Sequence, residues 1–121
     1  MIPRGGGTGF AGGCVPLDGG VVLSLERVRS LRSFDPLLWR MEVEAGRSTA
    51  EVAKLARESG LYFQPDPGAA EQSQIGGNVA TNAGGPHAFK YGVTDDVHRA
   101  AGVVLERHGR CTAGRYGPRA G

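Results

Sequence analysis

The chain has 121 residues, 21 of them glycine, and a formal net charge of +2. This length allows one domain, and 40% hydrophobic residues gathered in periodic segments argue against disorder. No apolar run reaches the ~18 residues of a membrane span. The sequence also has no basic stripe interleaved with aromatics for nucleic acid, no signal-peptide core, and only Cys14 and Cys111 for a disulfide or zinc site. We therefore expect a cytoplasmic protein without a metal.

A glycine-rich stretch, Arg4 to Gly13, begins the chain. It contains a G-x-G-x-x-G match from Gly7 to Gly12, but a dinucleotide-binding Rossmann site also needs a strand before the motif and a helix after it. Met1 to Pro3 is too short for a buried parallel strand, and Gly13 and Pro16 do not sustain a helix. A P-loop is favoured still less, because the Gly-Lys-Ser/Thr triplet is missing. The stretch is predicted to be a loop whose backbone N–H groups approach an anion.

Two strands are predicted next. Val21 to Leu25 is a short β-rich run that follows a turn signal. Trp39 to Glu44 alternates apolar and charged residues, which is typical of a half-buried strand, and Asp35-Pro36 is the connecting turn. Glu42 and Glu44 alternate on one face of that strand, and we expect that face to be solvated.

A helix follows with clear boundaries. Ser48 and Glu51 form a capping box, and Gly60 is placed to end the helix in a left-handed conformation. Lys54 and Glu58 are four residues apart and can pair. The residues expected to form the buried face are Val52, Leu55, Ala56 and Ser59.

The second glycine segment, Ile75 to Gly85, follows a rigid turn at Pro65 to Gly68 and is predicted to contain a short helix. Ser73 would cap this helix, and Gly84-Gly85-Pro86 would end it. Its apolar face would consist of Val79, Ala80 and Ala83. The N–H groups at its start, those of Gly76, Gly77 and Asn78, would favour an anion. Two such glycine segments in one chain indicate two backbone surfaces that close on one phosphorylated cofactor.

A last strand is predicted at Ala100 to Leu105. Beyond Glu106 the sequence contains mostly Gly, Arg, Pro and Ala, with few residues that could pack. We therefore divide the chain into a domain over residues 1–106 and a tail over residues 107–121, which is either disordered or the product of a shifted reading frame.

The order and spacing of four motifs resemble those of a known family. The motifs are Pro3 to Gly13, Pro65 to Pro67, Ile75 to Pro86, and Lys90 to Thr94. Together they resemble the FAD-linked oxidases of the vanillyl-alcohol-oxidase type, in the branch that holds the glycolate oxidase D subunit, D-lactate dehydrogenase and D-2-hydroxyglutarate dehydrogenase. The resemblance runs from about Ile2 to Leu105. It implies an α+β fold, namely a partial PCMH-type FAD-binding domain in which a short mixed sheet, one or two helices and two glycine-rich pyrophosphate loops hold the cofactor.

The resemblance also implies a set of cofactor contacts. Histidine is absent from the first loop, so non-covalent FAD is expected. Bland alternatives exist for some residues: Arg4 could be a solvated arginine, Thr81 and Asn82 could cap the helix, and His87 is expected to be an exposed loop residue. No catalytic residue and no metal ligand is assigned. The residues that the resemblance assigns to FAD are Arg4, Gly5, Gly6, Gly7, Thr8, Gly9, Pro67, Gly68, Gly76, Gly77, Asn78, Thr81, Asn82, Gly84 and Gly92.

The implied parent enzyme oxidises the CH–OH group of a D-2-hydroxy acid of the glycolate or D-lactate type and passes electrons to a quinone, flavoprotein or iron–sulfur partner. Complete members extend beyond both ends of this chain and carry a substrate-binding cap. We therefore expect a truncated and inactive fragment whose partners are FAD and other subunits or the missing parts of the enzyme. The alternative is a non-catalytic flavin-binding module completed by a partner subunit, or a pseudogene product.

Overall fold

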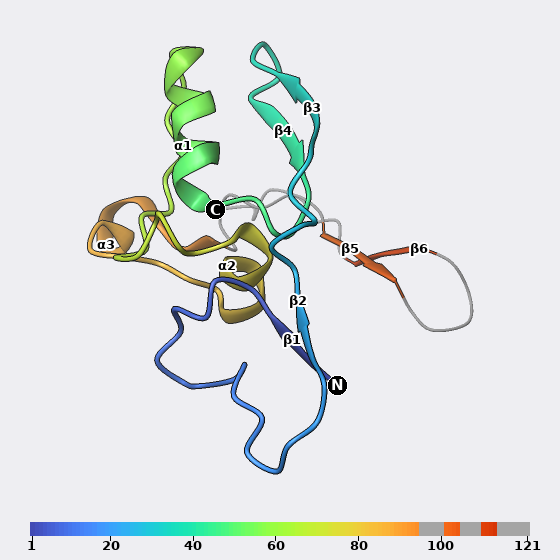
Figure 1. Cartoon of the computed structure of the whole chain (residues 1–121). Helices are drawn as coiled ribbons and strands as arrows, with labels where there is room; N and C mark the ends of the chain where they lie inside the picture. The colour runs from blue at the N-terminus through green and yellow to red at the C-terminus, as the bar shows by residue number, and fades with distance from the viewer. Residues whose placement is uncertain (95–100, 105–109, 114–121) are drawn as a thin grey trace.

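The computed structural model describes residues 1–94, 101–104 and 110–113, and these contain both strands and helices (Figure 1). The α+β class is confirmed. The strands form three two-stranded sheets instead of one short mixed sheet. In chain order the elements are β1 (Ile2–Arg4), β2 (Val22–Ser24), β3 (Leu31–Asp35), β4 (Arg40–Val43), α1 (Thr49–Glu58), α2 (Ile75–Thr81), α3 (Ala88–Tyr91), β5 (Ala101–Val104) and β6 (Arg110–Ala113).

The first sheet pairs β1 with β2 in parallel, with Ile2 opposite Val22 and Arg4 opposite Ser24. The long excursion between the two strands carries the first glycine loop, as Figure 1 shows. A parallel strand does precede the first glycine loop, but it is three residues long, and Pro3 and Arg4 are exposed. It is therefore not the buried parallel strand that the sequence argument ruled out.

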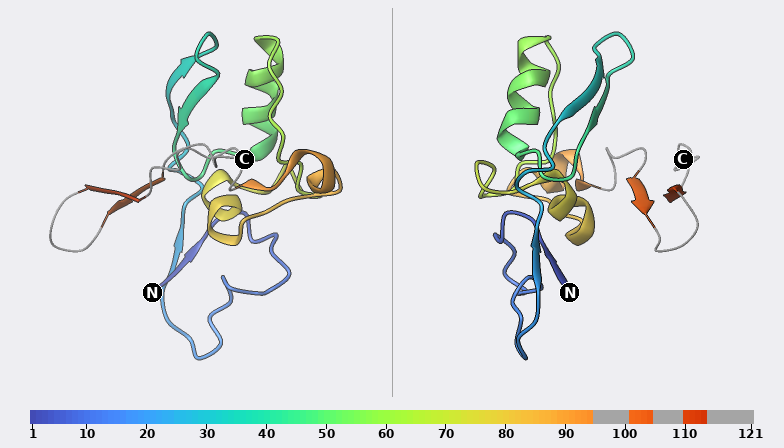
Figure 2. Two further views of the ribbon diagram at one scale, coloured as in Figure 1. Left: turned by 180° about the vertical axis from the view of Figure 1, so that it is seen from behind. Right: turned by 45° about the vertical axis from the view of Figure 1, so that its right-hand side comes forward.

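The second sheet is the antiparallel hairpin β3–β4, which stands beside α1 in the views of Figure 2. The sequence analysis predicted β4 and the turn but missed β3. In the turn, a carboxylate oxygen of Asp35 accepts hydrogen bonds from the N–H groups of Leu37 at 3.0 Å and Leu38 at 3.2 Å. Trp39 closes the turn with φ 52°, a left-handed conformation that is uncommon for a bulky residue.

Glu44, just after β4, is not the solvated residue that its alternation predicted. Only 16% of its side chain is exposed. Its carboxylate accepts a hydrogen bond from the Ser30 N–H at 2.7 Å and another from the Arg32 guanidinium. The Ser30 hydrogen bond, reinforced by Arg32 and opposed by burial, lowers the pKa of Glu44. The residue therefore ties the base of the hairpin together.

Helix α1 has the boundaries that the sequence predicted. The Ser48 side chain accepts from the Glu51 N–H, and the Glu51 side chain accepts from the Ser48 N–H, so both halves of the capping box are present. Gly60 follows the helix with φ 73°. The Lys54 Nζ atom lies 4.0 Å from a carboxylate oxygen of Glu58. The buried face differs from the prediction, because Thr49 is buried, Leu55 is only half-buried and Ser59 is exposed.

The centre of the molecule is a small core between α1 and the segment that leads into α2. Val52 and Ala56 are its buried apolar residues among those described. Beside them lies a buried polar network. The Thr49 and Ser73 hydroxyls are 2.7 Å apart, and the Asn78 amide donates to the Thr49 hydroxyl at 2.7 Å. Because this network fixes the start of α1 against the start of α2, it determines where the second glycine segment lies.

Ser73 was predicted to cap α2, and this prediction is wrong. The N-cap residue is Gln74, which makes no side-chain capping hydrogen bond. The Ser73 hydroxyl is instead 2.7 Å from that of Thr49, and its side chain is buried. At the other end, Asn82 ends the helix in a left-handed conformation with φ 49°, before the predicted stop at Gly84.

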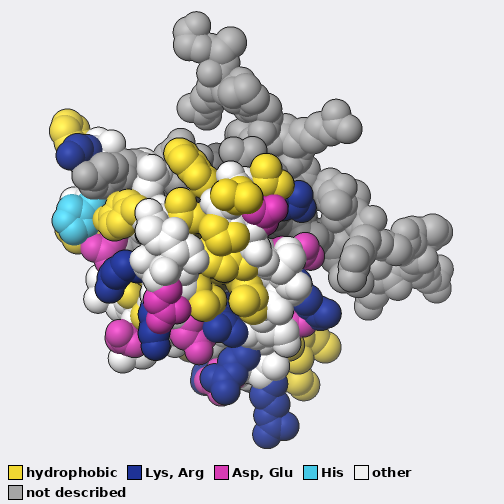
Figure 3. All heavy atoms as spheres, turned by 90° about the horizontal axis from the view of Figure 1, so that it is seen from above, with side chains coloured by type: hydrophobic (Ala, Val, Ile, Leu, Met, Phe, Trp, Pro, Cys, Tyr) yellow, Lys and Arg dark blue, Asp and Glu magenta, His cyan; other side chains and the backbone are white. Residues whose placement is uncertain are grey.

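Many large apolar side chains are exposed on the strands and their connections. Seen from above, hydrophobic side chains gather in the middle of the face over α1 and the hairpin (Figure 3). The exposed residues include Val21, Leu23, Leu31, Leu37, Leu38 and Trp39. Further along the chain, β5 confirms the centre of the predicted last strand. The tail contains β6, antiparallel to β5, where no strand was predicted; the other residues of 107–121 lie outside the described residues.

Candidate functional site

The first glycine loop, Gly5 to Gly9, follows β1 directly. Within the described part of the chain, none of its five consecutive backbone N–H groups has a hydrogen-bond acceptor. Gly7 adopts φ 71°, a conformation that glycine reaches without steric cost. Successive unpaired amides in a glycine turn form a concave row of donors that suits an anion. The loop therefore presents the kind of surface that a pyrophosphate needs.

This loop packs directly on the chain that leads into α2. A Cβ atom on Gly6 would lie 1.9 Å from the Gln72 carbonyl oxygen, so the two backbones touch and leave no room for a side chain. A Cβ atom on Gly5 would lie 3.7 Å from the Gly77 Cα atom. The structure thus brings the two glycine segments, far apart in sequence, into contact.

The second segment offers fewer amides than its sequence indicated. The Gly76 N–H donates to the Ala45 carbonyl at 2.8 Å, and the Asn78 N–H donates to the Gln74 carbonyl at 3.0 Å. The Gly77 N–H has no acceptor within the described residues. Gly76 instead serves packing, because a Cβ atom there would lie 2.7 Å from the Ala45 Cβ atom. Of the three predicted donors, Gly77 is the one available to a ligand.

The polar side chains of α2 have local roles. Asn78 is buried and donates to Thr49. The Thr81 hydroxyl donates to the Gly77 carbonyl at 2.9 Å, and its side chain is exposed. Asn82 is exposed at the left-handed end of the helix. Thr81 and Asn82 therefore stand at the surface beside the glycine segment, whereas the Asn78 amide is committed to the core.

Pro67 and Gly68 line a shallow cleft of about 380 Å³ together with Asp66, Gln72 and Pro86. The segments on its two sides are joined closely. A Cβ atom on Gly85 would lie 1.7 Å from the Asp66 carbonyl oxygen. Beyond this contact, Gly84 packs against Ala88 and Val93, and Gly92 ends α3 with φ 85°.

His87 has a partner that the sequence analysis missed. Its Nδ1 atom lies 3.0 Å from a carboxylate oxygen of Asp66, and both side chains remain about half exposed. The two residues are 21 positions apart, so a search for a carboxylate close in sequence could not find the pair. His87 is thus an exposed residue, as expected, that also links α3 to the turn at Pro65 to Gly68.

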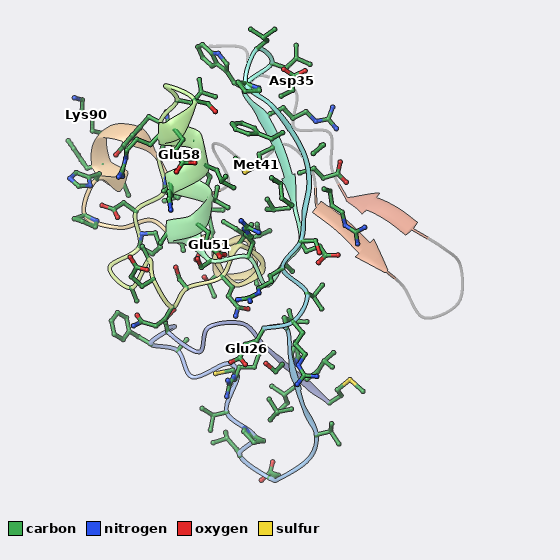
Figure 4. All side chains as sticks on the ribbon, turned by 45° about the horizontal axis from the view of Figure 1, so that its top comes forward. Glu26, Asp35, Met41, Glu51, Glu58 and Lys90 are labelled. Carbon is green, nitrogen blue, oxygen red and sulfur yellow. The ribbon has the colours of Figure 1, made fainter. Side chains whose placement is uncertain are left out.

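Arg4 is paired at the surface, and 44% of its side chain is exposed. Its guanidinium donates to a carboxylate oxygen of Glu26 at 2.8 Å. Glu26 lines a second cleft, of about 440 Å³, with Glu51, Gln72 and Gln74 among its other walls. Figure 4 shows Glu26 beside the β1–β2 part and Glu51 at the start of α1. Gln72 belongs to both clefts and contacts Gly6, so both clefts adjoin the first glycine loop.

These residues fit a pyrophosphate-containing cofactor. The unpaired amides of Gly5 to Gly9 supply donors, while the backbone contact at Gly6 holds them against the second glycine segment. Within the described ranges, no helix is long and apolar enough to cross a membrane. Nor do three or more His, Cys, Asp or Glu residues gather there as ligands for a metal ion.

Comparison with known proteins agrees with this geometry. Residues 1–113 match the family described as FAD binding domain. The chain is 42% identical over 105 residues to a D-lactate dehydrogenase of Anaerostipes hadrus, covering 87% of this chain and 22% of that protein. It is 39% identical over 106 residues to the glycolate oxidase subunit GlcD of Escherichia coli strain K12, covering 88% of this chain and 21% of that protein.

Among solved structures, an alkyldihydroxyacetonephosphate synthase superposes with a TM-score of 0.73 at 26% identity, covering 84% of this chain and 19% of that one. The chain thus spans about a fifth of the length of the relatives that it matches. FAD is the cofactor that this match and these relatives imply. The chain belongs to the FAD binding domain family of FAD-dependent oxidases and dehydrogenases.

Proposed function

We propose that this chain is the FAD-binding part of a flavin-dependent dehydrogenase or oxidase that acts on the CH–OH group of a D-2-hydroxy acid. The row of unpaired amides from Gly5 to Gly9 is the observation that carries the FAD site. The names of the two relatives above, a D-lactate dehydrogenase and a glycolate oxidase subunit, support the substrate class. No described residue is assigned to the chemical step.

In this proposal the first loop donates to the pyrophosphate, and the other contacts lie toward the ribityl chain and the flavin ring. Those contacts come from Gly77 and from residues of the neighbouring segments: Pro67, Gly68, Thr81, Asn82, Gly84 and Gly92. Gly76 and Asn78 contribute by packing, since their N–H groups are paired within the protein. FAD is bound non-covalently and supplies the hydride-accepting redox chemistry, while the protein binds and orients it.

In this proposal, further polypeptide from the same protein or from a partner subunit covers part of the surface of this chain. Hydrophobic side chains gather on the face over α1 and the hairpin (Figure 3), where Trp39 is 80% exposed, and contiguous exposed apolar side chains mark surfaces that another chain covers. That polypeptide would carry the substrate-binding and catalytic groups.

Titration of the 121-residue chain with FAD tests the cofactor site, with flavin fluorescence and retention after desalting as readouts. We expect saturable binding of one FAD per chain. A folded chain that leaves the fluorescence unchanged contradicts the proposal. The substrate class is tested by anaerobic bleaching of the flavin absorbance in the native protein with its accompanying polypeptide. D-lactate or glycolate should bleach the flavin and L-lactate should not.

A further inference from the structure

Gln74, which immediately precedes α2, holds a polar group without a partner inside the protein. The residue is only 8% exposed. Its side-chain oxygen Oε1 is fully buried and has no hydrogen-bond partner among the described residues. Buried polar atoms are almost always paired, and an unpaired one destabilises the folded state. An exception of this kind calls for a physical reason.

The buried polar network beside Gln74 makes its hydrogen bonds within itself. The Asn78 amide donates to the Thr49 hydroxyl, and the Thr49 and Ser73 hydroxyls bond each other. On its other side, Oε1 lies against the first glycine loop, 3.5 Å from the position that a Cβ atom on Gly5 would occupy. Two sets of nearby N–H groups lack an acceptor among the described residues, those of the first loop and that of Gly77, and Oε1 lies on the side of the first loop.

We propose that Gln74 is a positioning residue for the first glycine loop, and that Oε1 accepts a hydrogen bond from the N–H of Gly5 or Gly6 when a pyrophosphate is bound. This inference rests on the proposed function. An unpaired acceptor and a row of unpaired donors stand side by side in the ligand-free chain. A pyrophosphate that draws the loop inward engages the outer amides and leaves an inner one for Gln74. Oε1 is unpaired in the free protein and thereby gains a hydrogen bond in the complex.

The proposal predicts effects of opposite sign for the substitution Gln74→Met, which keeps the length of the side chain and removes both polar atoms. Without ligand, the variant should unfold at a temperature a few degrees higher, because the unpaired buried oxygen is gone. With ligand, it should bind FAD about fivefold to tenfold more weakly, because the loop loses its anchor. A residue that merely supports the fold would lower stability and affinity together.

The test compares wild type, Gln74→Met and the matched control Gln64→Met in the full chain. Gln64 is half-buried and lines neither of the two clefts, so its variant should bind both ligands as wild type does. FAD affinity is measured by fluorescence titration, and inorganic pyrophosphate affinity by competition with FAD. Because Gln74 acts through the loop, Gln74→Met should weaken both ligands by the same factor.

Three results would overturn the role of Gln74: an unchanged FAD affinity, a loss confined to FAD with pyrophosphate unaffected, or a lower unfolding temperature of the ligand-free variant. Failure of the proposed function is recognised separately, because in that case wild type itself does not bind FAD.

Discussion

Replacement of Gly6 by alanine tests how the first loop is held. The added Cβ atom would lie 1.9 Å from the Gln72 carbonyl oxygen, about 1.5 Å short of the 3.4 Å at which ordinary contact begins. Gln72 cannot yield easily, because its own N–H and that of Ser73 both bond the Ala69 carbonyl, at 3.0 and 2.7 Å. The loop must therefore move. Overpacking of this kind costs about 1–3 kcal/mol, which corresponds to a roughly tenfold to hundredfold loss of FAD affinity if the loop amides bind the cofactor.

Gly13 provides the matched control, because a Cβ atom there would meet nothing within 4 Å and its φ is not positive. Gly13→Ala lies outside the five residues assigned to the pyrophosphate and should bind FAD within about twofold of wild type, since no contact opposes the added methyl group. Both variants are titrated with FAD under the same conditions. Wild-type affinity in Gly6→Ala, or an equal loss in both variants, would refute the role assigned to the backbone contact.

Three further substitutions and one control, Ser59→Ala, test the fold by thermal unfolding. Trp39→Gly should raise stability by about 1 kcal/mol, because it relieves a left-handed φ of 52° at an exposed side chain; a loss would mean that the indole packs in solution. Ser48→Ala should cost about 1 kcal/mol by removing the α1 cap, while Ser59→Ala, at the exposed end, should change little. Glu44→Gln should be less stable than wild type at neutral pH. The native pKa of Glu44 is lowered, so its contribution is present above its ordinary pKa of 4.5 and disappears as the pH falls through the native value. A difference between these two proteins that does not depend on pH would contradict this.

The elements that sequence predicted well are those fixed by short-range chemistry. Helix α1 needs only a capping box at Ser48 and Glu51 and a glycine at position 60, and all three are visible within one stretch of chain. The family resemblance could also be recognised from sequence, because it depends on the order and spacing of motifs that include the two glycine segments. Strand β3 escaped because Leu31–Asp35 has no apolar alternation of its own and exists through its pairing with β4.

The sequence does not show which of the candidate site residues have unpaired backbone N–H groups. Gly76 and Asn78 look equivalent to Gly77 in sequence, yet their amides are taken by Ala45 and Gln74. Ser73 looks like a helix cap in the sequence, but its hydroxyl forms a hydrogen bond with that of Thr49, which is distant in sequence. These outcomes depend on long-range contacts, which local propensity does not encode. The buried and unpaired Gln74 oxygen is likewise visible only once the two glycine segments are placed together.

Amide NMR of the glycine-labelled chain during FAD titration tests the central claim most directly. The account predicts that the backbone signals of Gly5, Gly6, Gly7 and Gly9 shift as FAD is added. Gly19 and Gly20, in the turn before β2, should stay in place. Binding of FAD that leaves the first-loop signals unmoved, or that shifts the glycines of the turn equally, would contradict the assignment of this loop as the pyrophosphate site.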